Sequence, residues 1–186
     1  IIANGFDKAA LKILKLKKNL RLIDASDYSL NEILNINSIN DSILVQSEDN
    51  KIFSRKNFKI VSKKKPNKSQ FDNLIFAFNI CRFVKSNSIV LASNKSTIGI
   101  GSGQPSRLDS CKIAIDKMKK FINTNDEIVA ASDAFFPFVD GIEKLVQSGV
   151  SAVVQPAGSI RDKEIIKFAN ATGTILLFSK TRHFRH

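Results

Sequence analysis

The chain has 186 residues, of which 43% are hydrophobic and 25% are charged. This composition is typical of a globular protein and excludes a disordered tail or a collagen-like fibre. The 29 Lys and Arg residues outnumber 17 acids and give a net charge of +12, which suits nucleic acid, a membrane surface or small anions as partners. Because the excess is mostly Lys among many Ile, Asn and Phe residues, a bias that AT-rich coding alone produces, we interpret the overall charge as background.

Targeting and redox signals are sparse. No apolar run approaches the roughly 20 residues of a membrane span, so we expect no membrane partner. The segment 1–6 lacks Met and a basic region, which excludes a signal peptide and indicates a fragment entered in mid-protein. Cys81 and Cys111 fit small buried hydrophobes in a reducing cytosol, so we expect a cytoplasmic protein. Both His residues lie at the C-terminus and no Cys-x-x-Cys is present, so we expect no metal site.

The first part of the chain mixes short elements with polar connections. Asp7 is a plausible cap for an amphipathic helix over 7–18, and 24–40 is polar without a clear period. The segment 63–66 reads as a solvated connection. A core-facing helix is predicted from 69 to about 84. The strands predicted here are 1–4, 20–23, a hairpin of 42–46 with 51–53, and 58–61.

The second part alternates regularly between strands and helices. Asn94 and Lys95 mark the turn of a hairpin. The predicted strands are 88–92, 97–100, 127–131, 151–154 and 174–178, and the predicted helices are 105–121, 136–147 and 162–171. This alternation predicts an α/β fold, a sheet with helices on both faces. Without an internal repeat or a Pro/Gly/Ser linker, we expect one domain over 1–186.

Two segments that follow predicted strands are candidates for ligand binding. In 99–107, three glycines let backbone N–H groups approach an anion at a helix N-terminus, where Arg107 can reach phosphate oxygens. The spacing fits neither a P-loop nor the dinucleotide fingerprint, and a tight turn with a surface Arg explains the segment equally well. In 132–141, three Phe residues around a Pro could sandwich flat heterocycles, with Asp140 accepting from ring nitrogens. A helix start whose Phe side chains fill the core explains this segment slightly better.

Two further segments favour structural interpretations. Ser159 and Asp162 have the spacing of a capping box, which we favour over a binding loop. The segment 181–186 reads as a frayed basic tail, with folding into an anion site as the alternative. No nucleophile–base arrangement or catalytic acid–base pair is recognisable in the sequence.

Five segments, in this order, resemble one family: Lys85–Ser88, Gly99–Arg107, Ser132–Phe138, Gly158–Asp162 and Arg182–His186. The family comprises the bifunctional purine-biosynthesis enzymes with AICAR transformylase and IMP cyclohydrolase activities. The resemblance runs along most of the chain, including its first residues and the segment 63–66. Single motifs are weak signals, whereas five ordered ones are specific.

The resemblance implies that 1–186 is the C-terminal part of the transformylase region, a cytidine-deaminase-like α/β subdomain without zinc. It implies formyl transfer from 10-formyltetrahydrofolate, the co-substrate, to AICAR. Carried over residue by residue, the implied AICAR contacts are Asn87, Arg107, Phe135 and Arg182. The implied folate contacts are Leu108, Phe138, Asp140, Ser159, Ile160, Phe184 and His186.

The chain also departs from the family. Pro105 stands where the family has Gln or Met, and Val139 where Arg is common. The family's catalytic Lys-His pair and its cyclohydrolase domain belong to upstream segments, and its active sites are completed across a homodimer. We therefore expect activity to depend on segments outside these 186 residues. A non-catalytic basic module for nucleotide or RNA stays open as the alternative, although we expect nucleic acid not to be the partner.

Overall fold

The computed structural model describes residues 1–28, 34–121 and 127–185. The chain divides into two compact units, 1–50 and 51–186, each described here by itself. The predicted sheet with helices on both faces belongs to the second unit alone. None of the helices in the described ranges has both the length and the apolar character that crossing a membrane requires.

The first unit consists of short elements. Strand β1 (Ile2–Ala3) pairs in parallel with β2 (Ile23–Asp24), and helix α1 (Lys8–Leu14) lies between them in the chain. Asp7 caps α1 as predicted, since its side chain accepts from the backbone N–H of Ala10 at 2.6 Å. The helix ends earlier than predicted, at Leu14.

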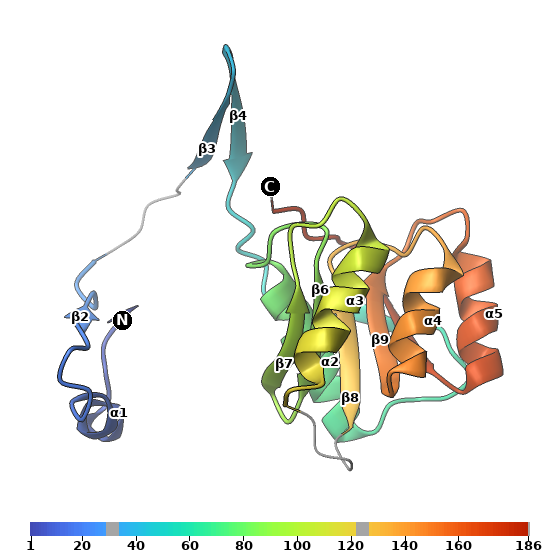
Figure 1. Cartoon of the computed structure of the whole chain (residues 1–186), viewed down its shortest axis with the longest axis horizontal. Helices are drawn as coiled ribbons and strands as arrows, with labels where there is room; N and C mark the ends of the chain where they lie inside the picture. The colour runs from blue at the N-terminus through green and yellow to red at the C-terminus, as the bar shows by residue number, and fades with distance from the viewer. Residues whose placement is uncertain (29–33, 122–126, 186) are drawn as a thin grey trace. The chain divides into compact units, whose positions relative to one another are not determined.

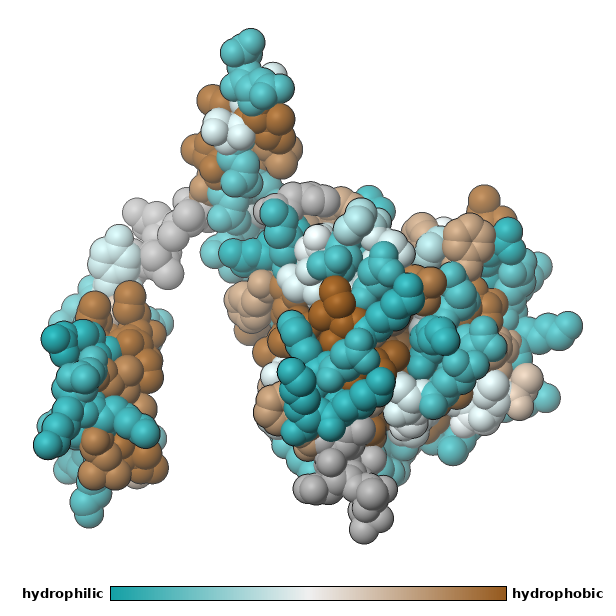
Figure 2. Space-filling view, viewed as in Figure 1, coloured by the Kyte–Doolittle hydropathy of each residue, from teal (hydrophilic) through white to brown (hydrophobic). Residues whose placement is uncertain are grey.

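The hairpin of the first unit differs from its prediction. Strand β4 (Ser42–Ser47) pairs antiparallel with β3 (Leu34–Ile39), not with 51–53. The two-residue connection begins at Asn40, whose φ of 51° suits Asn. The register places four exposed apolar side chains on one face of the hairpin: Leu34, Ile36, Ile43 and Val45. Figure 2 shows that this hairpin carries much hydrophobic surface. None of the described residues of this unit is buried.

The second unit is built on one six-stranded sheet. Its strands are β5 (Phe58–Ile60), β6 (Ile89–Ser93), β7 (Ser96–Gly101), β8 (Ile128–Ser132), β9 (Val150–Pro156) and β10 (Ile175–Ser179). The strand order is β5-β10-β9-β8-β6-β7, in which β8, β9 and β10 are parallel and the other pairs antiparallel. Its helices are α2 (Lys68–Cys81), α3 (Arg107–Met118), α4 (Val139–Gln147) and α5 (Asp162–Thr172).

Two apolar cores cover the two faces of this sheet. Alternate residues of the central strands contribute to opposite cores, as the period of two in a strand requires: Leu91 packs with α3, α4 and α5, whereas Val90 packs with α2. Figure 1 shows α3 and α4 in front of the sheet and α2 behind it. The predicted α/β class with helices on both faces is confirmed, and the likeness to cytidine deaminases stays a prediction.

Two local predictions in this unit are wrong for identifiable reasons. The segment 51–53 forms no strand, because the side-chain amide of Asn79 accepts from the N–H of Phe53 and donates to its carbonyl. These two bonds replace a strand ladder, and a short 3-10 helix (Arg55–Asn57) follows. Helix α4 begins at Val139 rather than at 136, because Phe136 is buried in the core ahead of the helix.

Candidate functional site

A cleft of about 620 Å³ opens at the sheet edge where β8 and β10 end. Because β6 runs antiparallel to β8 and to β7, the start of β6 and the end of β7 lie at the same edge. Side chains from four separate segments therefore meet there. The lining residues that the sequence singled out are Asn87, Arg107, Leu108, Phe135, Phe138, Asp140, Arg182 and Phe184. All four predicted AICAR contacts are brought together here, while their binding roles stay predictions.

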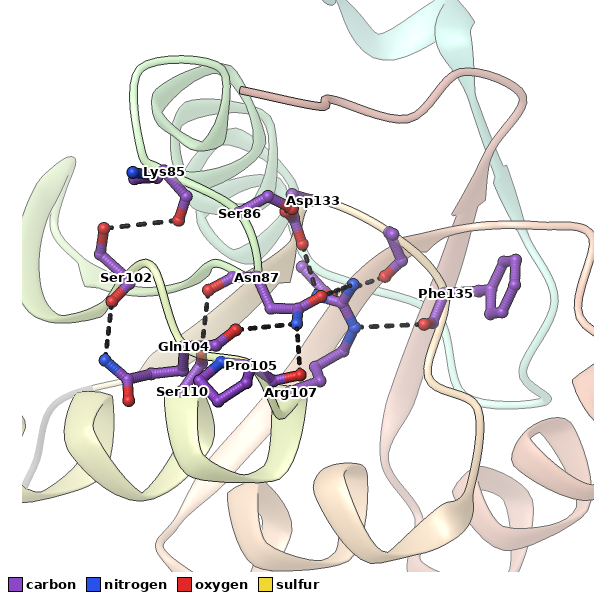
Figure 3. A network of polar contacts seen from close by, with 12 residues as sticks. Lys85, Ser86, Asn87, Ser102, Gln104, Pro105, Arg107, Ser110, Asp133 and Phe135 are labelled. Atoms are coloured by element: carbon purple, nitrogen blue, oxygen red, sulfur yellow. Dashed lines mark hydrogen bonds and ion pairs between the residues drawn. The ribbon is translucent and has the colours of Figure 1, made fainter. Parts of the chain in front are cut away.

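Arg107, the first residue of α3, is held by three protein acceptors (Figure 3). Its Nη1 donates to a carboxylate oxygen of Asp133 at 2.5 Å, Nη2 to the Asn87 side chain at 2.9 Å, and Nε to the Phe135 carbonyl at 3.2 Å. Its side chain is only 9% exposed. The guanidinium is thus oriented in advance, and a buried carboxylate offsets its charge.

Asp133 is a residue that sequence reasoning did not assign to the site. It follows β8 directly and is buried, and its second carboxylate oxygen accepts from the hydroxyl of Ser86. Its backbone carbonyl accepts from the N–H of His183 at 3.0 Å. An acid directly after a strand of five buried residues is a signal for such a role, because buried carboxylates need a partner. Asp133 therefore fixes the Arg107 side chain without itself lining the cleft.

The glycines at the end of β7 have a packing role. A Cβ at Gly99 would lie 2.1 Å from the carbonyl oxygen of Ala114, and one at Gly101 would lie 1.9 Å from that of Ser110. Both oxygens belong to α3, so these glycines let the helix pack directly on the strand. The N–H of Gly103 donates to the carbonyl of Lys85. The expectation that these glycines cradle an anion is not supported at these three positions.

The three Phe residues after β8 divide between the core and the cleft. Phe136 is 1% exposed and packs into the core, whereas Phe138 is 53% exposed. Phe135 and Phe138 both line the cleft, as predicted for rings that contact a flat ligand. The guanidinium of Arg161 lies 5.0 Å from the centroid of the Phe138 ring, which brings the loop before α5 toward this rim.

The segment 181–185 is folded against the sheet edge, so the frayed-tail interpretation is wrong for these residues. His183 is buried against the rings of Phe53 and Phe78, and the carbonyl of Arg185 accepts from the N–H of Ser86. This arrangement projects Arg182 into the cleft, with its guanidinium 5.0 Å from the Phe184 ring centroid. The predicted folate contact His186 lies outside the described residues.

The loop before α5 does not form the expected capping box. Arg161 occupies the N-cap position without a side-chain cap bond, and the Asp162 carboxylate accepts from the N–H of Gly158 at 2.8 Å. Ser159 accepts from the N–H of Arg161. Neither Ser159 nor Ile160 lines the cleft, and the Ile160 side chain is fully exposed.

The two thiols belong to the packed interior rather than to the site. Both are free and buried. Burial raises the pKa of Cys81 strongly and that of Cys111 to about 12, so both stay protonated at neutral pH. Within the described ranges, no three His, Cys, Asp or Glu side chains are grouped to hold a metal ion.

The fold and the cleft define an α/β protein whose largest described cleft-lining groups include arginine and phenylalanine side chains at the ends of its strands, where proteins of this class commonly bind small ligands. Residues 1–117 match the model of the AICARFT/IMPCHase bienzyme family. The chain belongs to this family. It spans about a third of the length of the curated relatives it matches.

Three relatives illustrate the similarity, all named bifunctional purine biosynthesis protein PurH. The chain is 44% identical over 188 residues to the protein of Buchnera aphidicola subsp. Schizaphis graminum and 46% over 188 residues to that of Buchnera aphidicola subsp. Baizongia pistaciae. It is 42% identical over 188 residues to the protein of Leptospira biflexa strain Patoc 1 / Ames. Each match covers 100% of this chain and 36% of the relative.

Proposed function

We propose that the chain is part of an enzyme of purine biosynthesis that transfers the formyl group of 10-formyltetrahydrofolate to AICAR, and that it contributes the binding cleft. One observation carries this proposal. The residues that the family resemblance designates come from separate segments of the sequence, and eight of them line a single cleft. The alternative, a basic module that binds through its net charge alone, does not explain why these particular side chains share one cleft.

Arg182 supplies the charge for the AICAR phosphate. Its side chain is exposed at the cleft, and among the described residues no carboxylate pairs with it. Arg107 is already neutralised by Asp133, so it acts by fixed N–H geometry more than by net charge. The N-terminus of α3 lies beside both and adds a partial positive charge.

The aromatic side chains receive the flat rings of the ligands. Phe135, whose carbonyl accepts from Arg107, contacts AICAR in this proposal. Phe138 and Phe184, whose rings are exposed in the cleft, contact the folate. The exposed carboxylate of Asp140 accepts from N–H groups of the folate ring. Ser159 and Ile160 lie outside the cleft lining, so in this proposal they contact a part of the folate that extends past Arg161, whose guanidinium lies 5.0 Å from the Phe138 ring centroid.

Chemistry needs groups beyond this cleft. No side chain lining it is a Lys or a His, so nothing in the described lining is suited to take the amine proton and stabilise the developing charge. We infer that the family's upstream Lys-His pair does so in the longer protein, within a homodimer in the cytoplasm. The 186-residue chain alone should therefore bind AICAR but not turn it over.

Calorimetric titration of AICAR into the chain tests this proposal. Losing a charged hydrogen bond costs roughly 1.5–3 kcal/mol, so Arg182→Ala should weaken AICAR binding about 10- to 150-fold and change folate binding less. Arg185→Ala is the matched control, because its side chain is exposed and lies outside the cleft lining. Normal AICAR binding by Arg182→Ala together with lost RNA binding would favour the basic module instead.

A further inference from the structure

A second concave surface of the second unit lies at the sheet edge where β5 pairs with β10. Its volume is about 240 Å³. The residues of this lysine pocket are Lys51, Lys56, Lys59, Lys180, Phe53, Asn57, Phe58, Phe178 and Thr181. We propose that the lysine pocket binds a small ligand that carries several phosphate or carboxylate groups.

The fold brings the four lysines together from distant parts of the sequence. Lys59 on β5 pairs in register with Phe178 on β10, and Lys180 follows two residues later. Lys51 precedes β5, and its ammonium group donates to the hydroxyl of Thr181 at 2.9 Å. The pocket is therefore built by sheet pairing and by a side-chain bond between the two segments.

No negatively charged side chain among the described residues of the lining offsets the positive charge of the lysine pocket. Among the described residues that form it, four carry an ammonium group and none carries a carboxylate. Each ammonium group offers three N–H donors and no acceptor. A ligand with several negatively charged oxygens satisfies these donors together and relieves the repulsion between neighbouring cations, which a single neutral ligand cannot do.

The walls favour a small polyanion over RNA. Single-stranded nucleic acid binds through exposed aromatic faces on which its bases stack. Phe53 and Phe178 are buried here, and the half-buried Phe58 packs its ring against Phe53, Phe71 and Phe78, so the aromatic rings of this pocket are engaged in the core rather than free for stacking. The pocket also has less than half the volume of the cleft that we assign to AICAR and folate.

The lysine pocket is separate from that cleft but adjacent to it along the chain. Thr181 lines the lysine pocket, and the next residue, Arg182, lines the cleft. None of the described residues belongs to both linings. Saturating the cleft with AICAR should therefore leave anion binding in the lysine pocket in place.

Calorimetric titration of the 186-residue chain at low ionic strength tests the proposal, with inorganic tripolyphosphate and citrate as probes. We expect at least one probe to bind saturably, and the stronger one identifies phosphate or carboxylate as the preferred group. The double variant Lys59→Gln/Lys180→Gln should weaken that binding about tenfold or more, which corresponds to 1.4 kcal/mol. The control Lys163→Gln/Lys167→Gln loses the same charge from the exposed surface of α5 and should bind nearly as wild type.

Four outcomes would overturn the proposal. The first is the absence of saturable binding of either probe, and the second is an equal loss in both double variants, which would mean attraction to net charge alone. The third is displacement of the probe by AICAR, which would place the anion in the cleft. The fourth is binding of single-stranded RNA, but of neither probe, that Lys59→Gln/Lys180→Gln abolishes.

Discussion

Replacing Asp133 by Asn tests whether the buried ion pair holds the cleft together. The substitution removes one negative charge and keeps the shape of the side chain. Asp133 is 1% and Arg107 9% exposed, so the guanidinium loses its counter-charge where water does not replace it. Breaking a buried pair in this way costs about 3–5 kcal/mol. With a urea m-value of about 1–3 kcal/mol/M, the unfolding midpoint should fall by at least about 1 M.

Urea unfolding followed by far-UV circular dichroism measures this loss. The matched control is Asp109→Asn, because Asp109 pairs with Lys112 at the surface, where both side chains are about half exposed and the pair contributes less than about 1 kcal/mol. Asp133→Asn combined with Arg107→Met should recover part of the stability, since no unpaired charge then stays buried. Equal midpoints for Asp133→Asn and Asp109→Asn would refute the reasoning.

Four further substitutions probe the surroundings of the site. Gly101→Ala would bring its Cβ to 1.9 Å from the Ser110 carbonyl oxygen and should cost about 1–3 kcal/mol, so an unchanged melting temperature would contradict the packing role. Phe136→Ala should lower the free energy of unfolding by about 3–5 kcal/mol, whereas Phe138→Ala should stay within about 0.5 kcal/mol and weaken folate binding instead. Because the pKa of Cys111 is raised from 9.0 to about 12, its thiol ionises first in the unfolded chain. Stability should therefore fall as pH rises from about 9 toward 12, and Cys111→Ala should reduce that fall in urea titrations but leave the part that the buried Cys81 thiol contributes.

Local sequence signals predicted most elements of the second unit. The turn at Asn94 and Lys95 is correctly placed, and both residues have positive φ values of 50° and 54°. The prediction paired 42–46 with the wrong partner, because it did not recognise 34–39 as a strand. Asn35 and Asn37 alternate there with apolar residues whose face is exposed, so the segment has the composition of a polar loop. Periodicity identifies strands well where one face is buried and poorly where neither is.

The sequence predicted which residues line the candidate site better than it predicted the contacts that these residues make with one another. The motifs placed Arg107 and Phe135 at strand ends, and both line the cleft. The neutralisation of Arg107 could not be predicted, because Asp133 lies 26 residues away and meets it only through the antiparallel pairing of β6 with β8. The sequence also suggested an anion-binding role for the glycines of β7, because only the tertiary structure shows that α3 packs directly against them.

The position of β10 in the sheet has a consequence for synthesis on the ribosome. Among the strands that the structure describes, β5 pairs with β10 only, and the hydrogen bond between Ser62 and Leu176 just beyond this pairing spans 114 residues. While the chain emerges, β5 has no strand to join until β10 has left the exit tunnel. Chains stalled between the two strands would expose an unpaired edge to proteases and chaperones, and Lys59 of β5 helps to keep such an edge soluble.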